Sequence, residues 1–458
     1  MAFRGGPGGR IRVPAPPGGF SRATREQPPG VGRGRGVKSA NNGPRVLVVG
    51  AGFAGLSTVS RLARGGLRVT LADRHIYSTF QPLLYQVATA GLAPSDVAYA
   101  LRGFAHKYGA RFRHGELAAV DAEARVAEFA DGGRVEYDYL ILAVGVTAAF
   151  YGITGAAEYS HGLYTLHDAV TMRERILAGL ERLSLEPDGH QDVTVTIVGG
   201  SATGVELAGT LADLRNLGLH ASYPEIDPER VHIRLMEQAP DLLGPFHPSL
   251  RDYARDQLVK RGVDLHLNAE IREITADRII LASGQEMPSN LTAWAAGVAG
   301  PPQLGKWGLP QGKGGRVPVG PDLRVEGQER IFAIGDIARP ENEPTPQLAQ
   351  PAIQMGRHAA GQIRRLEAGQ GTEPFHYHDK GTMATIGSRS AVVQLNHGIR
   401  FRGTIAWLAW LGLHLVTLLG GRNRINALIN LAYRYLSWRR GGGIIVGDDP
   451  PAQNAEGN

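Results

Sequence analysis

Two glycine-rich segments could each hold the pyrophosphate of a dinucleotide. They span residues 50–55 (GAGFAG) and 199–204 (GGSATG), and each lies between a hydrophobic run and an expected helix. In such loops glycine allows a tight turn and close approach of the backbone to the phosphates, and the N-terminus of the following helix attracts the anion. Two copies in one chain predict two dinucleotides bound side by side.

The first segment has all parts of the dinucleotide-binding fingerprint. Gly50, Gly52 and Gly55 occupy its three glycine positions, directly after a hydrophobic strand. A second hydrophobic run, residues 67–72, ends at Asp73, where a carboxylate can accept hydrogen bonds from the ribose hydroxyls. An ordinary glycine-rich loop is the alternative, but strand, glycines, helix and spaced acid together favour a nucleotide site.

The second segment departs from the fingerprint in two ways. Ser201 stands where the middle glycine is expected, so a nucleotide would sit slightly farther out or gain a hydroxyl contact. Glu237, after the strand at 231–236, follows Gly199 by 38 residues, whereas about 20 is usual. We expect residues 214–230 to form an excursion that accounts for the surplus. An acid at this strand end repels a 2′-phosphate, which favours NADH over NADPH. A Rossmann-like domain without nucleotide is the alternative.

The chain has 458 residues, enough for two or three domains, and no cysteine. Many flavoenzymes with two nucleotides pass electrons through a cysteine pair or a single thiolate, and this chain lacks both. Thiol and disulfide reductases, thiol-dependent peroxidases, sulfide oxidisers and cysteine-ligated metal sites are therefore excluded. Apart from His376 and His378, which would share one face of a strand, the histidines show no regular ligand spacing, so we expect no metal site.

The net charge of +6 comes from the N-terminal tail. Residues 1–44 carry seven Arg, one Lys and one Glu, whereas the remainder has 41 basic and 42 acidic side chains. We therefore expect no nucleic-acid-binding surface on the folded body. The tail is rich in Gly, Pro and Arg and cannot bury enough apolar surface to fold, so we expect disorder there and flexibility at 441–458.

The strands follow the order expected when one nucleotide-binding domain is inserted in another. Residues 138–144 form a further buried strand, followed by Gly145, and the second unit runs from about 165 to 297. Residues 330–334 then return to the first domain as a strand that ends just before Asp336. This order predicts a doubly wound α/β fold with two Rossmann-like domains.

The C-terminal part predicts short strands and then two apolar helices. Residues 404–420 are short for a bilayer span and carry His414 in the middle, so a transmembrane helix is disfavoured. In residues 424–440, polar side chains such as Asn430 and Arg434 share one stripe, apolar side chains share another, and the end carries tryptophan and arginine. We expect an amphipathic helix lying in a membrane surface. Packing on the protein's own core or on a dimer partner is the alternative.

Taken together, these features resemble the type II NADH dehydrogenases, the single-chain NADH:quinone oxidoreductases that do not pump protons. The resemblance runs from about residue 45 to residue 440. Its most specific parts are residues 80–89 (FQPLLYQVAT) and 349–354 (AQPAIQ). It also includes residues 204–209 (GVELAG), 294–298 (WAAGV) and 331–336 (IFAIGD).

The resemblance implies FAD at the first loop, NADH at the second, and a quinone as acceptor. The implied FAD site consists of Gly50, Gly52, Phe53, Ala54, Gly55, Asp73, Gly145 and Asp336. The implied NADH site consists of Gly199, Gly200, Gly204, Glu237 and Gly297, the last close to the nicotinamide. Gln350 and Gln354 resemble the quinone-site pair, and Lys380 resembles the lysine that borders that site.

The resemblance also implies a division into domains and a location. The expected parts are a tail at 1–44, an FAD-binding domain at 45–164 and 299–375, an NADH-binding domain at 165–298, a membrane-association region at 376–440 and a tail at 441–458. No signal segment is recognised and cytosolic NADH is the donor, so we expect the cytoplasmic face of the cell membrane. The sequence leaves open which quinone is used and whether a homodimer forms.

Reduction of a quinone consumes two protons, and Glu206 is the candidate that relays them. It lies in the early turns of the helix after the second loop. A carboxylate stabilised by the helix dipole is the structural alternative. Desolvation would raise its pKa and the dipole would lower it, and we expect desolvation to dominate.

Gln350 and Gln354 are four residues apart, so on a helix they share one face, where they could donate to quinone carbonyls or form a solvated polar stripe. We expect the flavin pocket to open towards the apolar C-terminal surface.

Two other functions remain open. One is a soluble NAD(P)H-dependent flavin reductase that donates to an electron-transfer protein, and the other is a redox-responsive binding protein.

Overall fold

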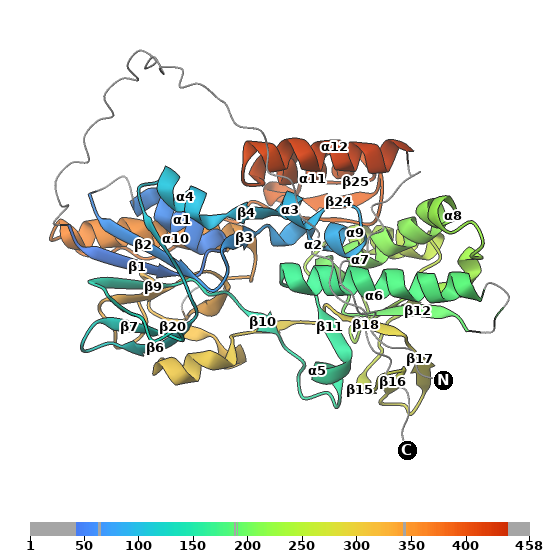
Figure 1. The fold of residues 1–458 in the computed structure, drawn as a ribbon, viewed down its shortest axis with the longest axis horizontal. Helices are drawn as coiled ribbons and strands as arrows, with labels where there is room; N and C mark the ends of the chain where they lie inside the picture. The colour runs from blue at the N-terminus through green and yellow to red at the C-terminus, as the bar shows by residue number, and fades with distance from the viewer. Residues whose placement is uncertain (1–42, 63–65, 187–188, 190, 342–344, 438–458) are drawn as a thin grey trace, which may run out of the picture. The chain divides into compact units, whose positions relative to one another are not determined.

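The computed structural model describes residues 43–437, except 63–65, 187–188, 190 and 342–344. The tail expected at 1–44 lies almost entirely outside the described residues, and the tail expected at 441–458 lies wholly outside them. The described chain contains two five-stranded parallel sheets, each with its own helices (Figure 1). The two-domain α/β architecture is therefore confirmed.

The first sheet has the strand order β21-β9-β1-β2-β5. Its strands are β1 (Arg45–Val49), β2 (Arg68–Asp73), β5 (Arg111–His114), β9 (Tyr139–Leu142) and β21 (Ile331–Ala333). The central strand β1 is buried almost throughout, as expected for a parallel sheet covered on both faces. Helices α1 (Phe53–Leu62) and α10 (Ala349–Glu367) cover one face, and the small antiparallel sheet β6-β7-β8 lies on the other side (Figure 1).

The second sheet repeats this plan with the order β11-β18-β12-β13-β14. Its strands are β11 (Ser160–Gly162), β12 (Val193–Val198), β13 (Val231–Met236), β14 (Asp264–His266) and β18 (Leu291–Trp294). The helices α6 (Leu166–Leu185), α7 (Ala202–Asp213) and α9 (Pro248–Lys260) belong to this domain. Because β21 follows the whole second domain and still pairs with β9, the second domain is inserted in the first, as predicted.

One strand of the second sheet lies earlier in the chain than expected. Strand β11 pairs in parallel with β18, so it belongs to the second sheet. This sheet therefore already includes residue 160, ahead of the start expected at about 165. The link between the domains is a two-stranded antiparallel ribbon of β10 (Thr147–Ala148) and β19 (Val298–Ala299), which carries the chain out and back.

The excursion expected at 214–230 is confirmed. It contains a π-helical turn, Leu214–Gly218, the short helix α8 (Leu219–Ser222) and a 3-10 turn, Pro228–Arg230. These turns lengthen the path from α7 to β13 without disturbing the sheet. The long spacing between the second glycine loop and its acid therefore reflects an inserted surface segment.

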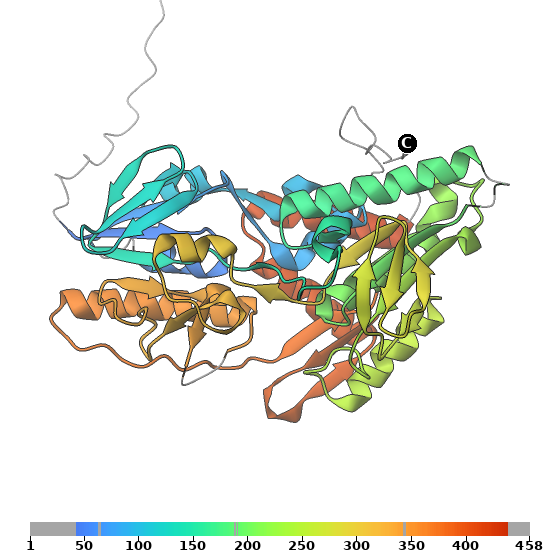
Figure 2. The same cartoon turned by 90° about the horizontal axis from the view of Figure 1, so that it is seen from below.

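After α10 the chain crosses to the second domain, where a small antiparallel sheet packs on α7 and α9 (Figure 2). This sheet consists of β23 (Thr382–Thr385), β24 (Ala391–Gln394) and β25 (Arg400–Arg402), so the expected short strands are confirmed. Helices α11 (Thr404–Thr417) and α12 (Gly421–Ser437) follow. Within the described chain, no helix combines the length and the apolarity needed to cross a bilayer.

Small residues bring α1 and α10 close together beside the first glycine loop. Ser57 Oγ donates to the carbonyl oxygen of Ile353 at 3.0 Å, and Thr58 Oγ1 donates to that of Gly356 at 3.1 Å. A Cβ atom at Gly356 would overlap the carbonyl oxygen of Ala54. Glycine at position 356 is therefore required by the spacing of the two helices.

We expect Gly356→Ala to lower the free energy of unfolding by about 1–3 kcal/mol, because the added methyl forces α1 and α10 apart. Gly361→Ala is the matched control, since a Cβ atom there meets nothing within 4 Å. The control should raise stability by about 0.5–1 kcal/mol, because alanine is the better helix former. Urea denaturation measures both. Equal effects of the two substitutions would contradict this account of the α1–α10 contact.

Candidate active site

A cavity of about 720 Å³ opens at the carboxyl ends of the strands of the first sheet. Its size suits a bound cofactor, and its position beside the first glycine loop is where open α/β sheets bind ligands. The expected FAD residues that line it are Gly50, Gly52, Phe53, Ala54, Asp73, Gly145 and Asp336. Gly55 does not line it, because it faces the loop backbone, where a Cβ atom would overlap the carbonyl oxygen of Gly50.

The first loop is shaped to receive a pyrophosphate. Gly50 has a φ of +102°, and a Cβ atom there would overlap the main chain at Ala143. A Cβ atom at Gly52 would meet nothing within 4 Å, so this position leaves open space above the helix N-terminus. Asp73 is held beside the loop, since its carboxylate accepts from the N–H groups of Ala51 and His75, both at 2.7 Å. These features fit the pyrophosphate and ribose of FAD.

The second loop repeats this geometry. Gly199 has a φ of +110°, and a Cβ atom there would overlap the main chain at Ala295. Glu237 accepts from the N–H group of Gly200 and, at 2.7 Å, from that of Ala239. This pattern matches that of Asp73 in the first domain. Glu237 therefore holds the same position relative to its glycine loop as Asp73 does, despite its unusual distance along the chain.

Ser201 takes a role that the sequence did not predict. Its hydroxyl donates to the carbonyl oxygen of Ala295 at 3.1 Å, at the end of the neighbouring strand β18. The serine thus connects the loop to the sheet.

Gly297 is in close contact with the side chain of Tyr151. A Cβ atom at Gly297 would overlap the tyrosine hydroxyl. From the second nucleotide loop and α7, only Thr203 and Glu206 line the large cavity.

Asp336 is partly buried at the wall of the cavity. Tyr164 donates its hydroxyl to Asp336 Oδ2 at 3.3 Å, and Arg316 Nε donates to the carbonyl oxygen of Asp336 at 2.9 Å. Burial raises the pKa of the Asp336 carboxyl above its ordinary value, while the bond from Tyr164 opposes this shift. Tyr164 and Arg316 carry no motif, so sequence reasoning missed them.

Glu206 lies on α7, where its carboxyl group reaches the same cavity. The side chain is almost fully buried, and Oε1 accepts from the N–H group of Thr385 at 3.2 Å. Burial raises the pKa of Glu206 to about 8, while the bond from Thr385 and the nearby side chain of Trp410 act to lower it. The expectation that desolvation dominates is confirmed.

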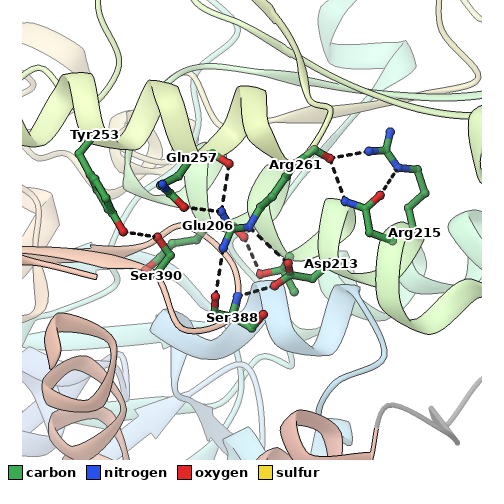
Figure 3. Close-up of polar contacts among 10 residues, drawn as sticks. Glu206, Asp213, Arg215, Tyr253, Gln257, Arg261, Ser388 and Ser390 are labelled. Atoms are coloured by element: carbon green, nitrogen blue, oxygen red, sulfur yellow. Dashed lines mark hydrogen bonds and ion pairs between the residues drawn. The ribbon is translucent and has the colours of Figure 1, made fainter. Parts of the chain in front are cut away.

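A second carboxylate on α7 anchors the turn between β23 and β24 (Figure 3). Asp213 lies seven residues after Glu206, accepts from the N–H group of Ser388, and pairs with Arg261 Nε at 3.3 Å. Arg261 also donates to the carbonyl oxygen of Ser388 at 3.0 Å. The turn that supplies Thr385 to Glu206 is therefore fixed at both ends by α7. A spacing of seven on one helix face was the only sequence signal for Asp213.

The structure does not bring the expected quinone-site residues to the cavity. From α10 the lining residues are Ala349 and Ala352, and Gln350 is not among them. The Gln354 amide binds the backbone of His378, donating to its carbonyl oxygen at 2.9 Å and accepting from its N–H group at 3.0 Å. Lys380 is exposed and does not line the cavity. The assignment of these three residues to a quinone site stays a prediction.

Among the described residues, the lining of the cavity includes no side chain of α11 or α12, so the expected opening to the apolar C-terminal surface stays a prediction. Aromatic side chains fill the intervening space: Trp410 is 2 % exposed, His414 stacks on it with ring centroids 4.0 Å apart, and Phe80 meets His414 edge to face. A layer of aromatic rings therefore separates Glu206 from the outer face of α11.

Helix α12 turns its polar stripe inward. Asn430 Nδ2 donates to Asp96 Oδ2 at 2.7 Å, and Arg434 Nη1 donates to Gln86 Oε1 at 2.8 Å. The apolar stripe faces out, with Ile429 59 % exposed. The other exposed apolar residues on α11 and α12 are Ile405, Leu408, Leu413, Val416, Ile425, Leu428 and Tyr433. We call these eight residues the apolar face. The tryptophan and arginines at 438–440 lie outside the described residues.

Comparisons with known proteins agree with this geometry. Residues 44–356 match the family model described as pyridine nucleotide-disulphide oxidoreductase. The chain is 35 % and 33 % identical to the type II NADH:quinone oxidoreductases NdhA and Ndh of Mycobacterium tuberculosis. These alignments cover 87 % of this chain and 88 % and 89 % of the two relatives.

A solved structure with a similar fold is NDH2 from Plasmodium falciparum in complex with NADH, with a TM-score of 0.79. That likeness, at 20 % identity, covers 87 % of this chain and 99 % of the other. The family match spans both glycine loops, and the two curated relatives extend it over most of the chain. The chain therefore belongs to the pyridine nucleotide-disulphide oxidoreductase family, among the type II NADH:quinone oxidoreductases.

Proposed function

We propose that the protein oxidises NADH with FAD as its cofactor and reduces a quinone to a quinol, without pumping protons. The observation that carries this proposal is the presence of two dinucleotide loops, each with its acid at a strand end, together with Glu206 in the wall of the cavity beside the first loop. FAD, when bound, accepts a hydride from the nicotinamide and passes two electrons to the quinone. The protein supplies binding, orientation and protons.

The two strand-end acids define which dinucleotides fit. Asp73 and Glu237 each lie where a carboxylate can bind ribose hydroxyls, and Glu237 would repel the 2′-phosphate of NADPH. Asp336 would bind the ribityl or pyrophosphate part of FAD from the opposite side of the cavity. These positions favour NADH as the donor.

Glu206 is the proposed proton donor. Reduction of a quinone to a quinol takes up two electrons and two protons, so each turnover needs a group that donates protons at the cavity. A carboxyl group with a pKa of about 8 is protonated at neutral pH and can donate one proton at a time. We retain Gln350, Gln354 and Lys380 as residues that border the quinone, and the bond from Gln354 to His378 would then hold the Lys380 segment against α10.

The apolar face is the proposed contact with the cytoplasmic surface of the cell membrane. Its side chains are exposed to water in the isolated protein, at a cost of roughly 1.5–3 kcal/mol for each large residue that could be buried. The inward polar stripe of α12 supports this orientation, because an amphipathic helix that only packed on its own core would turn its apolar side inward. A quinone dissolved in the bilayer would then arrive beside α11.

The oxidation of NADH and the reduction of quinone can be followed separately through the flavin absorbance. We expect NADH to bleach the flavin of the FAD-loaded protein under anaerobic conditions, and a soluble quinone to restore the absorbance within the turnover time. Persistent bleaching with quinone would contradict the proposal. Rapid recovery with an electron-transfer protein but not with quinone would indicate a soluble flavin reductase.

Glu206→Gln should slow quinone reduction by about 10²- to 10⁴-fold, since the amide cannot donate a proton in the same way. Bleaching by NADH should persist. Glu270→Gln is the control, because Glu270 is exposed and does not line the cavity. Steady-state rates with quinone measure the effect. An unchanged rate would remove Glu206 from the mechanism.

The same substitution should change how stability depends on pH. The pKa of Glu206 rises from 4.5 to about 8 in the folded chain, so the folded state keeps a proton that the unfolded state releases. Burial of Glu206 therefore carries no ionisation penalty below about pH 4.5, and the free energy of unfolding falls as the pH rises from about 4.5 to about 8. Glu206→Gln should flatten that decline in a series of urea denaturation curves.

Ile425→Glu combined with Ile429→Glu should weaken binding to vesicles that contain anionic lipid by at least about tenfold, because two buried side chains contribute more than about 1.4 kcal/mol. Leu185→Glu is the control, since Leu185 is 81 % exposed at the end of α6, away from the apolar face. Vesicle co-sedimentation measures all three proteins. Equal binding, or no binding by the unsubstituted protein, would contradict the membrane contact.

A further inference from the structure

A tyrosine of the second domain meets an acid of the first domain at the cavity wall. Tyr164 lies two residues after β11 of the second sheet, and it lines the cavity together with Gly145 and Asp336. Gly145 follows β9 and Asp336 follows β21, which are neighbouring strands of the first sheet. The carboxyl ends of strands from both sheets therefore come together at one place on this wall.

The hydroxyl group of Tyr164 lies close to both of these residues. It donates to Asp336 Oδ2 at 3.3 Å. A Cβ atom at Gly145 would lie 3.3 Å from the hydroxyl oxygen, so glycine at this position leaves the hydroxyl the room that it needs. Burial raises the pKa of Tyr164 above its ordinary value, so the hydroxyl keeps its proton at neutral pH and remains a donor.

The backbone of Tyr164 is fixed by the first turn of α6. Asp168 Oδ2 accepts from the N–H group of Tyr164 at 3.0 Å and from that of Thr165 at 2.7 Å. The N–H group of Asp168 donates in turn to Thr165 Oγ1 at 3.1 Å, which completes a capping box. The tyrosine side chain therefore starts from a fixed point of the second domain.

The backbone at Asp336 is fixed separately, by the first domain. Arg316 Nε donates to the carbonyl oxygen of Asp336 at 2.9 Å, and the N–H group of Gly335 donates to Met355 Sδ at 3.3 Å. These bonds hold the main chain and leave the carboxylate free to rotate. Of the described residues, Tyr164 alone donates a hydrogen bond to that carboxylate.

We propose that Tyr164 is a positioning residue for FAD: it holds the Asp336 carboxylate from the second domain, so that both domains together complete the flavin site. The proposal rests on the proposed function, in which Asp336 binds part of the FAD molecule. A carboxylate accepts hydrogen bonds from hydroxyl groups and repels a phosphate, so the ribityl hydroxyls are the partners that this acid fits. Tyr164 acts through the carboxylate that it orients.

The first test is Tyr164→Phe, which keeps the ring and removes the donor. We expect FAD to leave the diluted holoenzyme about three- to tenfold faster, because the carboxylate then has to be ordered when FAD binds, and changes of affinity appear mainly in the dissociation rate. The rise in flavin fluorescence after dilution measures the release.

Tyr223→Phe is the matched control. The Tyr223 hydroxyl also donates to a carboxylate, Glu181 Oε1, at 2.7 Å, but neither residue lines the cavity. This control should release FAD at the unsubstituted rate. An unchanged rate in Tyr164→Phe, or equal acceleration in both variants, would overturn the proposal.

The pH dependence of FAD release separates positioning from a general loss of packing. Burial raises the pKa of the Asp336 carboxyl, while the bond from Tyr164 and the charge of Arg316 lower it. On α10, Ala352 and Met355 lie against this turn and carry no charge. Protonation removes an acceptor, so FAD release should accelerate as the pH falls through this pKa. In Tyr164→Phe the pKa rises, so the acceleration should begin about one pH unit higher.

Asp336→Asn assigns this response, since the acceleration at low pH should be absent from that variant. The other carboxyl and imidazole groups of the cavity wall are Asp73, His75, Glu116 and Glu206. If Asp336→Asn releases FAD at the unsubstituted rate and with the unsubstituted pH profile, the proposed role of Asp336 fails and the positioning role fails with it. If Asp336→Asn accelerates release while Tyr164→Phe does not, only the positioning role is overturned. Release needs neither NADH nor quinone, so a failure of the quinone assignment leaves this test intact.

A second test retains the hydroxyl, so it holds even if Tyr164→Phe does not fold. 3-Fluorotyrosine in place of Tyr164 keeps the ring and makes the hydroxyl a stronger donor. A stronger bond to the carboxylate lowers the pKa of Asp336, so the acceleration of FAD release should begin at lower pH than in the unsubstituted protein. A profile that stays in place, or that moves to higher pH, would overturn the proposal.

Discussion

The arrangement of the whole site depends on how closely each glycine loop approaches the neighbouring strand. Gly50 and Gly199 both have positive φ, and a Cβ atom at either would overlap the end of the adjacent strand. This contact leaves the N–H groups of each loop free to meet the acid at the next strand end. Both nucleotide sites therefore follow from the same steric constraint, used once in each domain.

The features that the sequence could predict are local ones. The glycines, Asp73 and the strands around them lie within one βαβ unit, so their spacing along the chain reflects their spacing in the fold. Glu237 was predictable for the same reason, once residues 214–230 were read as an excursion. The place of β11 in the second sheet was not expected, because this strand has three residues and carries no pattern that distinguishes it from a loop.

The features that could not be predicted depend on contacts between distant segments. Tyr164 and Asp336 are 172 positions apart, and no local pattern relates them. The amide of Gln354 is bound to the backbone of His378, so its position on a helix face did not reveal where its hydrogen bonds go. The pKa of Glu206 could be reasoned from the helix dipole and from desolvation, but only the burial of the side chain decides between them.

The inward polar stripe of α12 has a consequence for handling the purified protein. The helix is held to the rest of the protein by hydrogen bonds from Asn430 and Arg434. Its exposed side includes Ile425, Leu428 and Ile429, and exposed apolar side chains of neighbouring molecules associate with one another in water. The particle size measured in buffer without detergent therefore includes association through these apolar side chains. A dimer observed under those conditions counts as the native assembly only if it persists when detergent is added.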